Sequence, residues 1–298
     1  MPPAPTTDHP LRGILLILAA MALFNLADGL SKYLAGAYQP IQVVWGRYLF
    51  HAVFLAPFVL RRGMAATLAS ARPRVQWARA LVLISSSLVF MFALAHLGLA
   101  EAITVGFVSP LFITALSVPL LGEKVGVRRW LAVLIGFLGI VVIVRPGTAA
   151  FDPWALLPLL SSALWALGVI GTRVSGQIDS PLTTVSYNTL VGLVVTSALT
   201  PFVWSMPGAE DWLVFAIGGG GNVLGQYLMV RAFAVAPASM LAPFSYSQLL
   251  WSTLIGWLLF QAVPDVTTYF GAAIIIASGI YVWHRERAAA MRATDRRG

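Results

Sequence analysis

Residues 13–34 read GILLILAAMALFNLADGLSKYL, a stretch in which only Asp28 and Lys32 carry charge. A helix needs about 20 mostly apolar residues to cross the roughly 30 Å of bilayer hydrocarbon, so this stretch is expected to span a membrane. Its polar residues Asn25, Asp28 and Lys32 are spaced i, i+3 and i+7 and therefore share one helix face. That face should point into the protein, because a charged side chain in hydrocarbon costs about 2.5–3.5 kcal/mol.

The rest of the chain is similarly apolar. Of its 298 residues, 59% are hydrophobic and 10% are charged, whereas soluble domains are about 45–50% apolar and about 25% charged. This composition excludes a soluble globular protein and a disordered chain. The apolar runs are continuous rather than alternating, which predicts an all-α bundle of ten transmembrane helices. They lie near Gly13–Leu34, Ile41–Leu60, Trp77–His96, Ala102–Leu121, Arg129–Val144, Pro153–Thr172, Leu182–Trp204, Asp211–Phe233, Ser239–Phe260 and Val266–His284.

Basic residues gather on one side of this predicted bundle. With the N-terminus inside, all but three of the 19 Lys and Arg fall on the cytoplasmic side, the exceptions being Lys32, Arg47 and Arg145. The positive-inside rule then predicts that both termini are cytoplasmic in a multi-pass protein of the bacterial inner (plasma) membrane. A basic surface facing anionic lipid accounts for the net charge of +8, so no nucleic-acid partner is expected.

The two halves of the chain resemble each other weakly. An offset of 141 residues places Lys32 on Arg173 and Pro40 on Pro181. Each half then holds five spans, and because five is odd, the second half enters the membrane from the opposite side. Such inverted repeats are typical of secondary transporters. The predicted organisation is a cytoplasmic tail (1–12), a first five-helix repeat (13–147), a second, inverted five-helix repeat (148–284) and a basic cytoplasmic tail (285–298).

Three motifs carry a resemblance to a known family. They are PIQVVWGRY at 40–48, Gly122-Glu123-Lys124 at the end of the fourth span, and the run Trp130–Pro146. In these the chain, over about residues 13–284, resembles the EamA-type transporters of the drug/metabolite transporter superfamily. The second half departs from the pattern with Phe260-Gln261 in place of Gly122-Glu123, so a role of Glu123 need not be duplicated. The resemblance implies a ten-helix carrier with a central cavity between the halves, which moves small metabolites, often outward, without ATP.

No catalytic or metal-binding constellation is expected. Cysteine is absent, and the four His are scattered with no His-Glu-x-x-His arrangement. The run 218–221 is all glycine, but it lies in an apolar span and lacks the Lys-Ser or Lys-Thr of a phosphate loop, which favours close helix packing. We therefore expect neither an enzyme nor a cofactor or metal. The alternative from another class is a membrane enzyme or a structural subunit.

Charged residues on the first two spans are candidates for a pair. Arg47 and His51 are four residues apart and share a face of the second span, and Arg47 lies at a depth similar to that of Asp28. Their counterparts in the second repeat are Val169 and Asn188, so the charge is lost from both positions together. Asp28, Arg47, Lys32 and His51 are the gate or charge-pair candidates. A structural pair, and for Lys32 snorkelling to the interface, are the alternatives.

Further polar and aromatic residues could line the cavity. Amide and hydroxyl groups would fix the polar end of an amphipathic ligand, and aromatic side chains would contact its flat or apolar part. Asn222 and Gln226, at i and i+4, form one hydrogen-bonding stripe, for which the alternative is a helix-gluing role. The substrate-cavity candidates are Asn25, Asp28, Ser86, Trp165, Asn222, Gln226, Tyr246, Gln248 and Trp251.

Together these features predict a secondary active transporter of small amphipathic metabolites, working by alternating access at a midplane cavity. Export of amino acids or related compounds is the leading expectation, and uptake of a vitamin-like or nucleoside-like molecule is the alternative. Protons are the favoured coupling ion because titratable groups lie within the spans. The expected partners are the small-molecule substrate and the lipid bilayer, with the chain acting as a monomer or homodimer.

Overall fold

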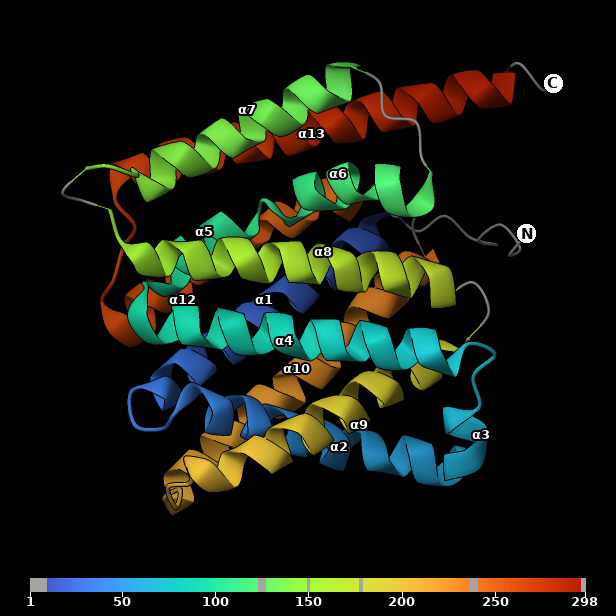
Figure 1. The fold of residues 1–298 in the computed structure, drawn as a ribbon, viewed down its shortest axis with the longest axis vertical. Helices are drawn as coiled ribbons and strands as arrows, with labels where there is room; N and C mark the ends of the chain where they lie inside the picture. The colour runs from blue at the N-terminus through green and yellow to red at the C-terminus, as the bar shows by residue number, and fades with distance from the viewer. Residues whose placement is uncertain (1–9, 123–126, 149–150, 177–178, 236–240, 296–298) are drawn as a thin grey trace.

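The computed structural model describes residues 10–122, 127–148, 151–176, 179–235 and 241–295, and all regular structure in these ranges is helical (Figure 1). The prediction of an all-α fold is confirmed. The helices of the first half are α1 (Pro10–Ala35), α2 (Pro40–Arg62), α3 (Met64–Leu68), α4 (Pro73–His96), α5 (Leu99–Gly106), α6 (Ser109–Leu121) and α7 (Val127–Val144). Those of the second half are η1 (Pro153–Ala155), α8 (Leu156–Gly176), α9 (Pro181–Leu199), η2 (Thr200–Phe202), α10 (Ala209–Val235), η3 (Ala242–Ser247), α12 (Gln248–Phe260) and α13 (Val266–Asp295).

Several of these segments can cross a bilayer, and within the described residues each of the ten predicted spans is mostly helical. Within the described residues, six segments are long and apolar enough to span, and two shorter helical stretches are also apolar. The chain is therefore a multi-pass membrane protein. The six are Leu11–Ala35, Pro40–Arg62, Pro73–His96, Leu99–Leu120, Pro153–Thr172 and Leu182–Phe202, and the shorter two are Trp130–Val144 and Val266–Tyr281.

The fourth predicted span is not one continuous helix, which corrects the sequence-based expectation. It is divided into α5 and α6, with the break after Gly106. Pro110 lacks the backbone N–H that would bond to the Gly106 carbonyl four residues earlier. The Ser162 hydroxyl of α8 lies 3.3 Å from that carbonyl oxygen, and at 2.7 Å it is closer to the Pro158 carbonyl of its own helix. A polar side chain of a neighbouring helix thus lies beside the backbone group freed by the proline.

The ninth predicted span is interrupted in a matching way. From Ala242 the described part of this span is the 3₁₀ helix η3, which contains Pro243 near its start, and α12 follows directly. The two interruptions meet, since the rings of Phe107 and Tyr246 lie 5.5 Å apart between centroids. These residues are separated by 139 positions, close to the repeat offset. Each half therefore contributes its interrupted span to this contact. Two equivalent elements are expected to meet in this way when a two-fold axis relates the halves.

The last helix continues beyond the predicted tenth span, whose apolar stretch is Val266–Tyr281. We expected it to end near His284, but α13 continues to Asp295. The added segment contains Glu286, Arg287 and a run of Ala, all strong helix formers, so local propensity favours the extension. In Figure 1, α1 begins and α13 ends at the same end of the bundle.

Helix pairing between the halves follows the repeat. α1 packs along α10 and α4 packs along α8, and these two pairs are counterparts under the repeat offset. α2 and α9, the second span of each half, pack on each other. α7 and α13, the fifth of each half, form a pair at one edge of the molecule (Figure 1). The two halves are thus interlocked across the whole bundle, as expected of two EamA-like repeats.

The crossing of α2 and α9 shows the two-fold relation between the halves at the level of single residues. Tyr48 packs directly on Gly192, which has no side chain to keep the ring away, and His51 is hydrogen-bonded to Thr189. The offset of 141 makes Thr189 the counterpart of Tyr48 and Gly192 the counterpart of His51. A residue of each helix contacts the counterpart of the other, which is the pattern of a two-fold interface.

Glycines allow other close approaches. On α10, Gly219 and Gly220 pack against Phe50 and Phe54 of α2, so the packing role predicted for residues 218–221 is confirmed. The motif residue Glu123 lies outside the described residues.

Candidate functional site

The first polar cluster joins α1 to α2. Arg47 Nη2 lies 3.5 Å from Asp28 Oδ1, and the two side chains are only 16% and 21% exposed. The same nitrogen donates a hydrogen bond of 3.1 Å to Ser31 Oγ, one turn beyond Asp28 on α1. It also lies 4.0 Å from Met91 Sδ of α4. The guanidinium is therefore held at a point where three spans of the first half meet.

The second cluster lies one turn farther along α2, at the crossing with α9. His51 is 3% exposed, and its Nδ1 lies 2.8 Å from Thr189 Oγ1. Gln226 Nε2 of α10 lies 3.4 Å from His51 Nε2 and donates to Asn222 Oδ1 at 3.0 Å. His51 thus connects α2 with both α9 and α10 of the second half.

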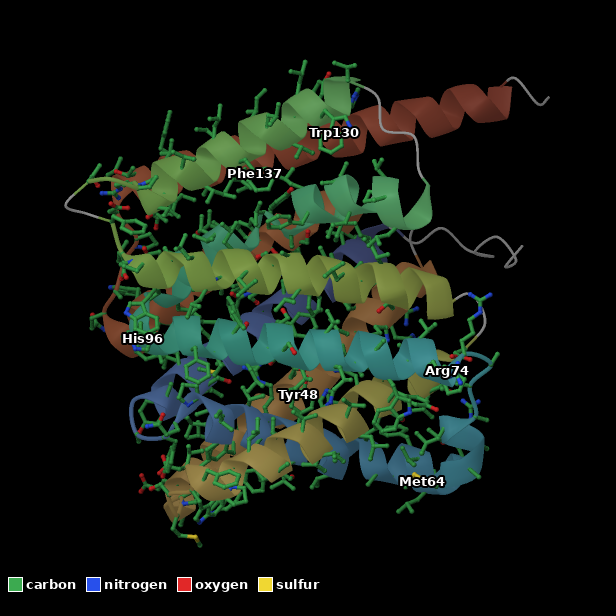
Figure 2. The ribbon with its side chains drawn as sticks, in the orientation of Figure 1. Tyr48, Met64, Arg74, His96, Trp130 and Phe137 are labelled. Carbon is green, nitrogen blue, oxygen red and sulfur yellow. The ribbon has the colours of Figure 1, made fainter. Side chains whose placement is uncertain are left out.

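Tyr48, between Arg47 and His51 in sequence, marks the depth of these clusters. Figure 2 shows it about midway along the bundle between His96 at one end and Arg74 at the other. The ring of Tyr48 also lies edge-on to His51, with 6.2 Å between centroids. The polar residues on this part of α2 therefore lie in the middle of the bundle.

The third cluster lies between α1 and the interrupted ninth span. Asn25 Nδ2 donates to the Met21 carbonyl at 2.8 Å, and Gln248 Nε2 approaches Met21 Sδ at 3.0 Å. Trp251, one turn beyond Gln248 on α12, packs against the apolar cluster that includes Met21. Asn25, Gln248 and Trp251, all substrate-cavity candidates, thus lie near Met21. Tyr246 lies apart from them, against Phe107 and Gly279.

Three other candidates have different surroundings. Lys32 Nζ donates to the Leu94 and Leu97 carbonyls at 2.8 and 2.5 Å, so its ammonium caps the C-terminus of α4 rather than joining the charge pair. Ser86 Oγ donates to the Ser161 carbonyl at 2.8 Å and links α4 to α8. Trp165 is 50% exposed on α8.

Polar contacts also connect the halves at both ends of the bundle. At one end, the Tyr38 hydroxyl donates to Asp211 Oδ2 at 2.6 Å, a bond that raises the pKa of Tyr38. Gln42 Nε2 donates to the Ser205 carbonyl at 2.5 Å, and Ser205 N donates back to Gln42 Oε1 at 2.9 Å. We call these four residues the Tyr38 latch. A surface hollow of about 500 Å³ beside it is lined by 35–39 together with Phe202, Val203 and Ser205, and contains none of the candidates.

At the other end, Asp179 of the α8–α9 connection holds the start of α4. Its carboxylate accepts from Ser70 Oγ at 2.5 Å, Ala71 N at 3.1 Å and Gln76 Nε2 at 2.8 Å. Partial burial alone would raise the pKa of Asp179, but these hydrogen bonds outweigh it and lower the pKa below its ordinary value. We call this set the Asp179 latch. Each latch joins a first-half segment to a second-half segment.

Comparison with known proteins agrees with this architecture. The sequence model of the EamA-like transporter family matches residues 11–145 and 152–283. A crystal structure of a protein 19% identical superimposes with a TM-score of 0.64 over 90% of this chain and 95% of that chain, which shows the shared fold.

The relatives of known function are carriers. The chain is 29% identical to the S-adenosylmethionine uptake transporter of Rickettsia prowazekii, over 93% of this chain and 94% of that protein. It is 30% identical to the riboflavin transporter of Vibrio cholerae, over 92% and 93%. It is 24% identical to the pseudopaline exporter CntI of Pseudomonas aeruginosa, over 90% and 94%.

Proposed function

Because this chain belongs to the EamA-like transporter family, a family of carriers rather than enzymes, we propose that it takes up a metabolite that combines a fused heteroaromatic ring with a polar chain. Transport of small metabolites is common to the relatives described above. The finer proposal concerns substrate and direction, for which amino-acid export was our leading expectation. The relatives favour the alternative, uptake of a nucleoside-like or vitamin-like molecule.

The observation that carries the proposal is the pair of polar clusters in the middle of the bundle. Asp28 and Arg47 present opposite charges 3.5 Å apart, and His51 lies one turn away in contact with the second half. The ammonium group of a zwitterion can pair with Asp28, and its carboxylate can pair with Arg47. Such a molecule can therefore bind there without leaving either charge unpaired. S-adenosylmethionine has such an amino-acid end, and riboflavin has a hydroxylated chain that suits hydrogen bonding.

The two latches support alternating access. Each connects the halves through polar side chains and backbone near a membrane surface, where water can replace the contacts when a latch opens. Opening the Tyr38 latch alone would expose the clusters to one side, and opening the Asp179 latch alone would expose them to the other. We propose that the Asp179 end is cytoplasmic, because Arg61, Arg62, Arg72 and Arg74 lie there.

The test is uptake into proteoliposomes that contain only this protein. Labelled S-adenosylmethionine and riboflavin are offered in parallel with leucine as the plain amino acid. We expect saturable uptake of at least one ring-bearing compound and none of leucine. Arg47→Gln should abolish it, whereas Arg62→Gln, at the exposed end of α2, should leave it near the wild-type rate. Leucine transport without transport of either ring compound would refute the proposal.

Coupling to protons is a second testable part of the proposal. His51 and Asp28 are titratable groups within the spans, which favours protons as the driving ion. Collapsing an imposed pH gradient with a protonophore should therefore slow uptake several-fold. If uptake responds only to the substrate gradient, the carrier is a uniporter and proton coupling is wrong.

A further inference from the structure

Two buried polar atoms between α1 and α12 have no hydrogen-bond partner among the described residues. They are the acceptor Asn25 Oδ1 and the donor Trp251 Nε1, and Ser247 Oγ, just before α12, is a third such atom. Asn25 is 1% exposed, and its other amide atom, Nδ2, is already bonded to the Met21 carbonyl. Buried side-chain polar atoms are nearly always paired, so a donor and an acceptor left unpaired in one region call for an explanation.

Asn25 and Trp251 lie at the same level of two parallel helices. Met21 contacts Gln248 at one level, and Gly29 packs against the Ile255 side chain at another. Between these contacts Asn25 lies four residues after Met21, and Trp251 lies three residues after Gln248. At 1.5 Å per residue these steps are about 6 and 4.5 Å, so the two side chains face the same layer of the bundle.

The surroundings of this layer are aromatic and apolar. Trp251 packs against the cluster formed by Ile17, Ala20, Met21, Ala232 and Leu241, together with Phe24 and Phe244. Aromatic side chains with a few polar atoms on their edge suit a flat ligand that carries both a donor and an acceptor. An adenine ring has this pattern, with an exocyclic amino group beside a ring nitrogen.

We propose that Asn25 and Trp251 form a ring subsite, in which Trp251 Nε1 donates to a ring nitrogen and Asn25 Oδ1 accepts from the exocyclic amino group of an adenine-like ring. This rests on the proposed function and adds to it the part of the site that recognises the ring. Asp28, one turn beyond Asn25 on the same face of α1, then receives the charged end of the same molecule together with Arg47. The two ends of the substrate are thus read by separate residues.

The test uses Trp251→Phe, which keeps an aromatic ring and removes the N–H. Trp257→Phe is the matched control, because Trp257 is on the same helix and is 50% exposed. Equilibrium binding of adenosine and of methionine to the purified full chain is measured separately. Trp251→Phe should weaken adenosine binding about tenfold, equivalent to about 1.4 kcal/mol, and leave methionine binding unchanged. Trp257→Phe should change neither.

A second measurement separates a ligand contact from an internal one. Because Trp251→Phe also removes ring volume packed against the apolar cluster, the melting temperature is compared with and without adenosine for each variant rather than between ligand-free proteins. The rise in melting temperature caused by adenosine should shrink. An adenosine-induced rise that is as large in Trp251→Phe as in the wild type would show that Nε1 does not contact the ring, and would overturn the ring subsite.

Other outcomes distinguish this inference from the proposed function. Uptake of S-adenosylmethionine or riboflavin by a wild-type protein that does not bind adenosine would leave the proposed function standing and refute the ring subsite. Equal weakening of adenosine and methionine by Trp251→Phe would also refute it. Adenosine binding that depends on Trp251, without uptake of any compound tested, would support the ring subsite and refute the proposed function.

Discussion

At the scale of single residues, Arg47 and Asp28 depend on each other. Asp28→Asn or Arg47→Gln alone leaves one mostly buried charge without its partner, which typically costs about 3 kcal/mol or more. The double variant removes both charges and should be destabilised less than the sum of the two. Unfolding in detergent measures this coupling, and adding Asp28→Asn to Arg62→Gln should give simple additivity as the control. Additive effects for Asp28 and Arg47 would mean that the pair does not form.

The helix ends at Gly122 and Gln261 make a second comparison at this scale. Both residues end a helix in the left-handed conformation, with φ of 68° and 53°. Only glycine adopts it without strain from a side chain, and a Cβ on Gly122 would meet no other atom. Gln261→Gly should therefore stabilise the protein by about 1 kcal/mol, and Gly122→Ala should destabilise it by a similar amount, both read from thermal unfolding. Equal melting temperatures for Gly122→Ala and the wild type would contradict this.

At the scale of helices, the pairing of α7 with α13 depends on two glycines. A Cβ on Gly271 would lie 2.7 Å from the Gly139 carbonyl oxygen and 2.4 Å from Ile143 Cγ1. The oxygen belongs to a helix backbone and cannot move alone, so Gly271→Ala should separate the helices and cost about 1–3 kcal/mol. Gly218→Ala is the control, because its Cβ would have its nearest neighbour at 3.8 Å. If Gly271→Ala and Gly218→Ala have the same melting temperature, the contact between Gly139 and Gly271 does not stabilise the pairing of α7 with α13.

The Asp179 latch predicts how connections between elements respond to pH. Hydrogen bonds lower the pKa of Asp179 in the folded protein, so the unfolded chain binds its proton more tightly. The resulting stabilisation is complete above the ordinary pKa of about 3.9 and is lost as pH falls through the folded value. The melting temperature of the wild type should thus fall more steeply below about pH 4 than that of Asp179→Asn. Parallel pH profiles would show that the latch carboxylate does not contribute.

At the scale of the whole molecule, hydropathy was sufficient to predict the fold because bilayer thickness fixes the length of every span. The interruptions near Phe107 and Tyr246 were missed because proline also occurs in intact membrane helices. Nothing in the sequence around Pro110 indicates that the Ser162 hydroxyl lies near the Gly106 carbonyl. The boundary predicted between residues 147 and 148 stays a prediction.

The candidate site was less predictable, because it depends on which helices touch. Counting depth along two neighbouring spans was enough to suggest Asp28 with Arg47. Thr189 was missed as the partner of His51, since only the crossing of α2 and α9 brings them together. Its position as the repeat counterpart of Tyr48 was the available signal. The acceptors of Lys32 could not be predicted, because they lie more than 60 residues away in sequence.

Orientation in the membrane is the last property of the whole molecule that we predict. The chain has no Cys, so a single introduced thiol reports its own position. Met206 is 74% exposed beside the Tyr38 latch, and Met64 is 59% exposed at the arginine-rich end (Figure 2). Five predicted spans separate them, so they must lie on opposite sides. Met206→Cys should react with a membrane-impermeant maleimide on intact cells, because the positive-inside rule places the basic end in the cytoplasm.

Met64→Cys is the matched control and should react only after the cells are permeabilised. Both variants replace an exposed methionine, so a difference between them reports the side of the membrane rather than burial. Labelling of Met64→Cys on intact cells, with protection of Met206→Cys, would reverse the orientation and keep the fold. Labelling of both from one side would require an even number of crossings between them, which would contradict five spans in each half and with it the inverted repeat.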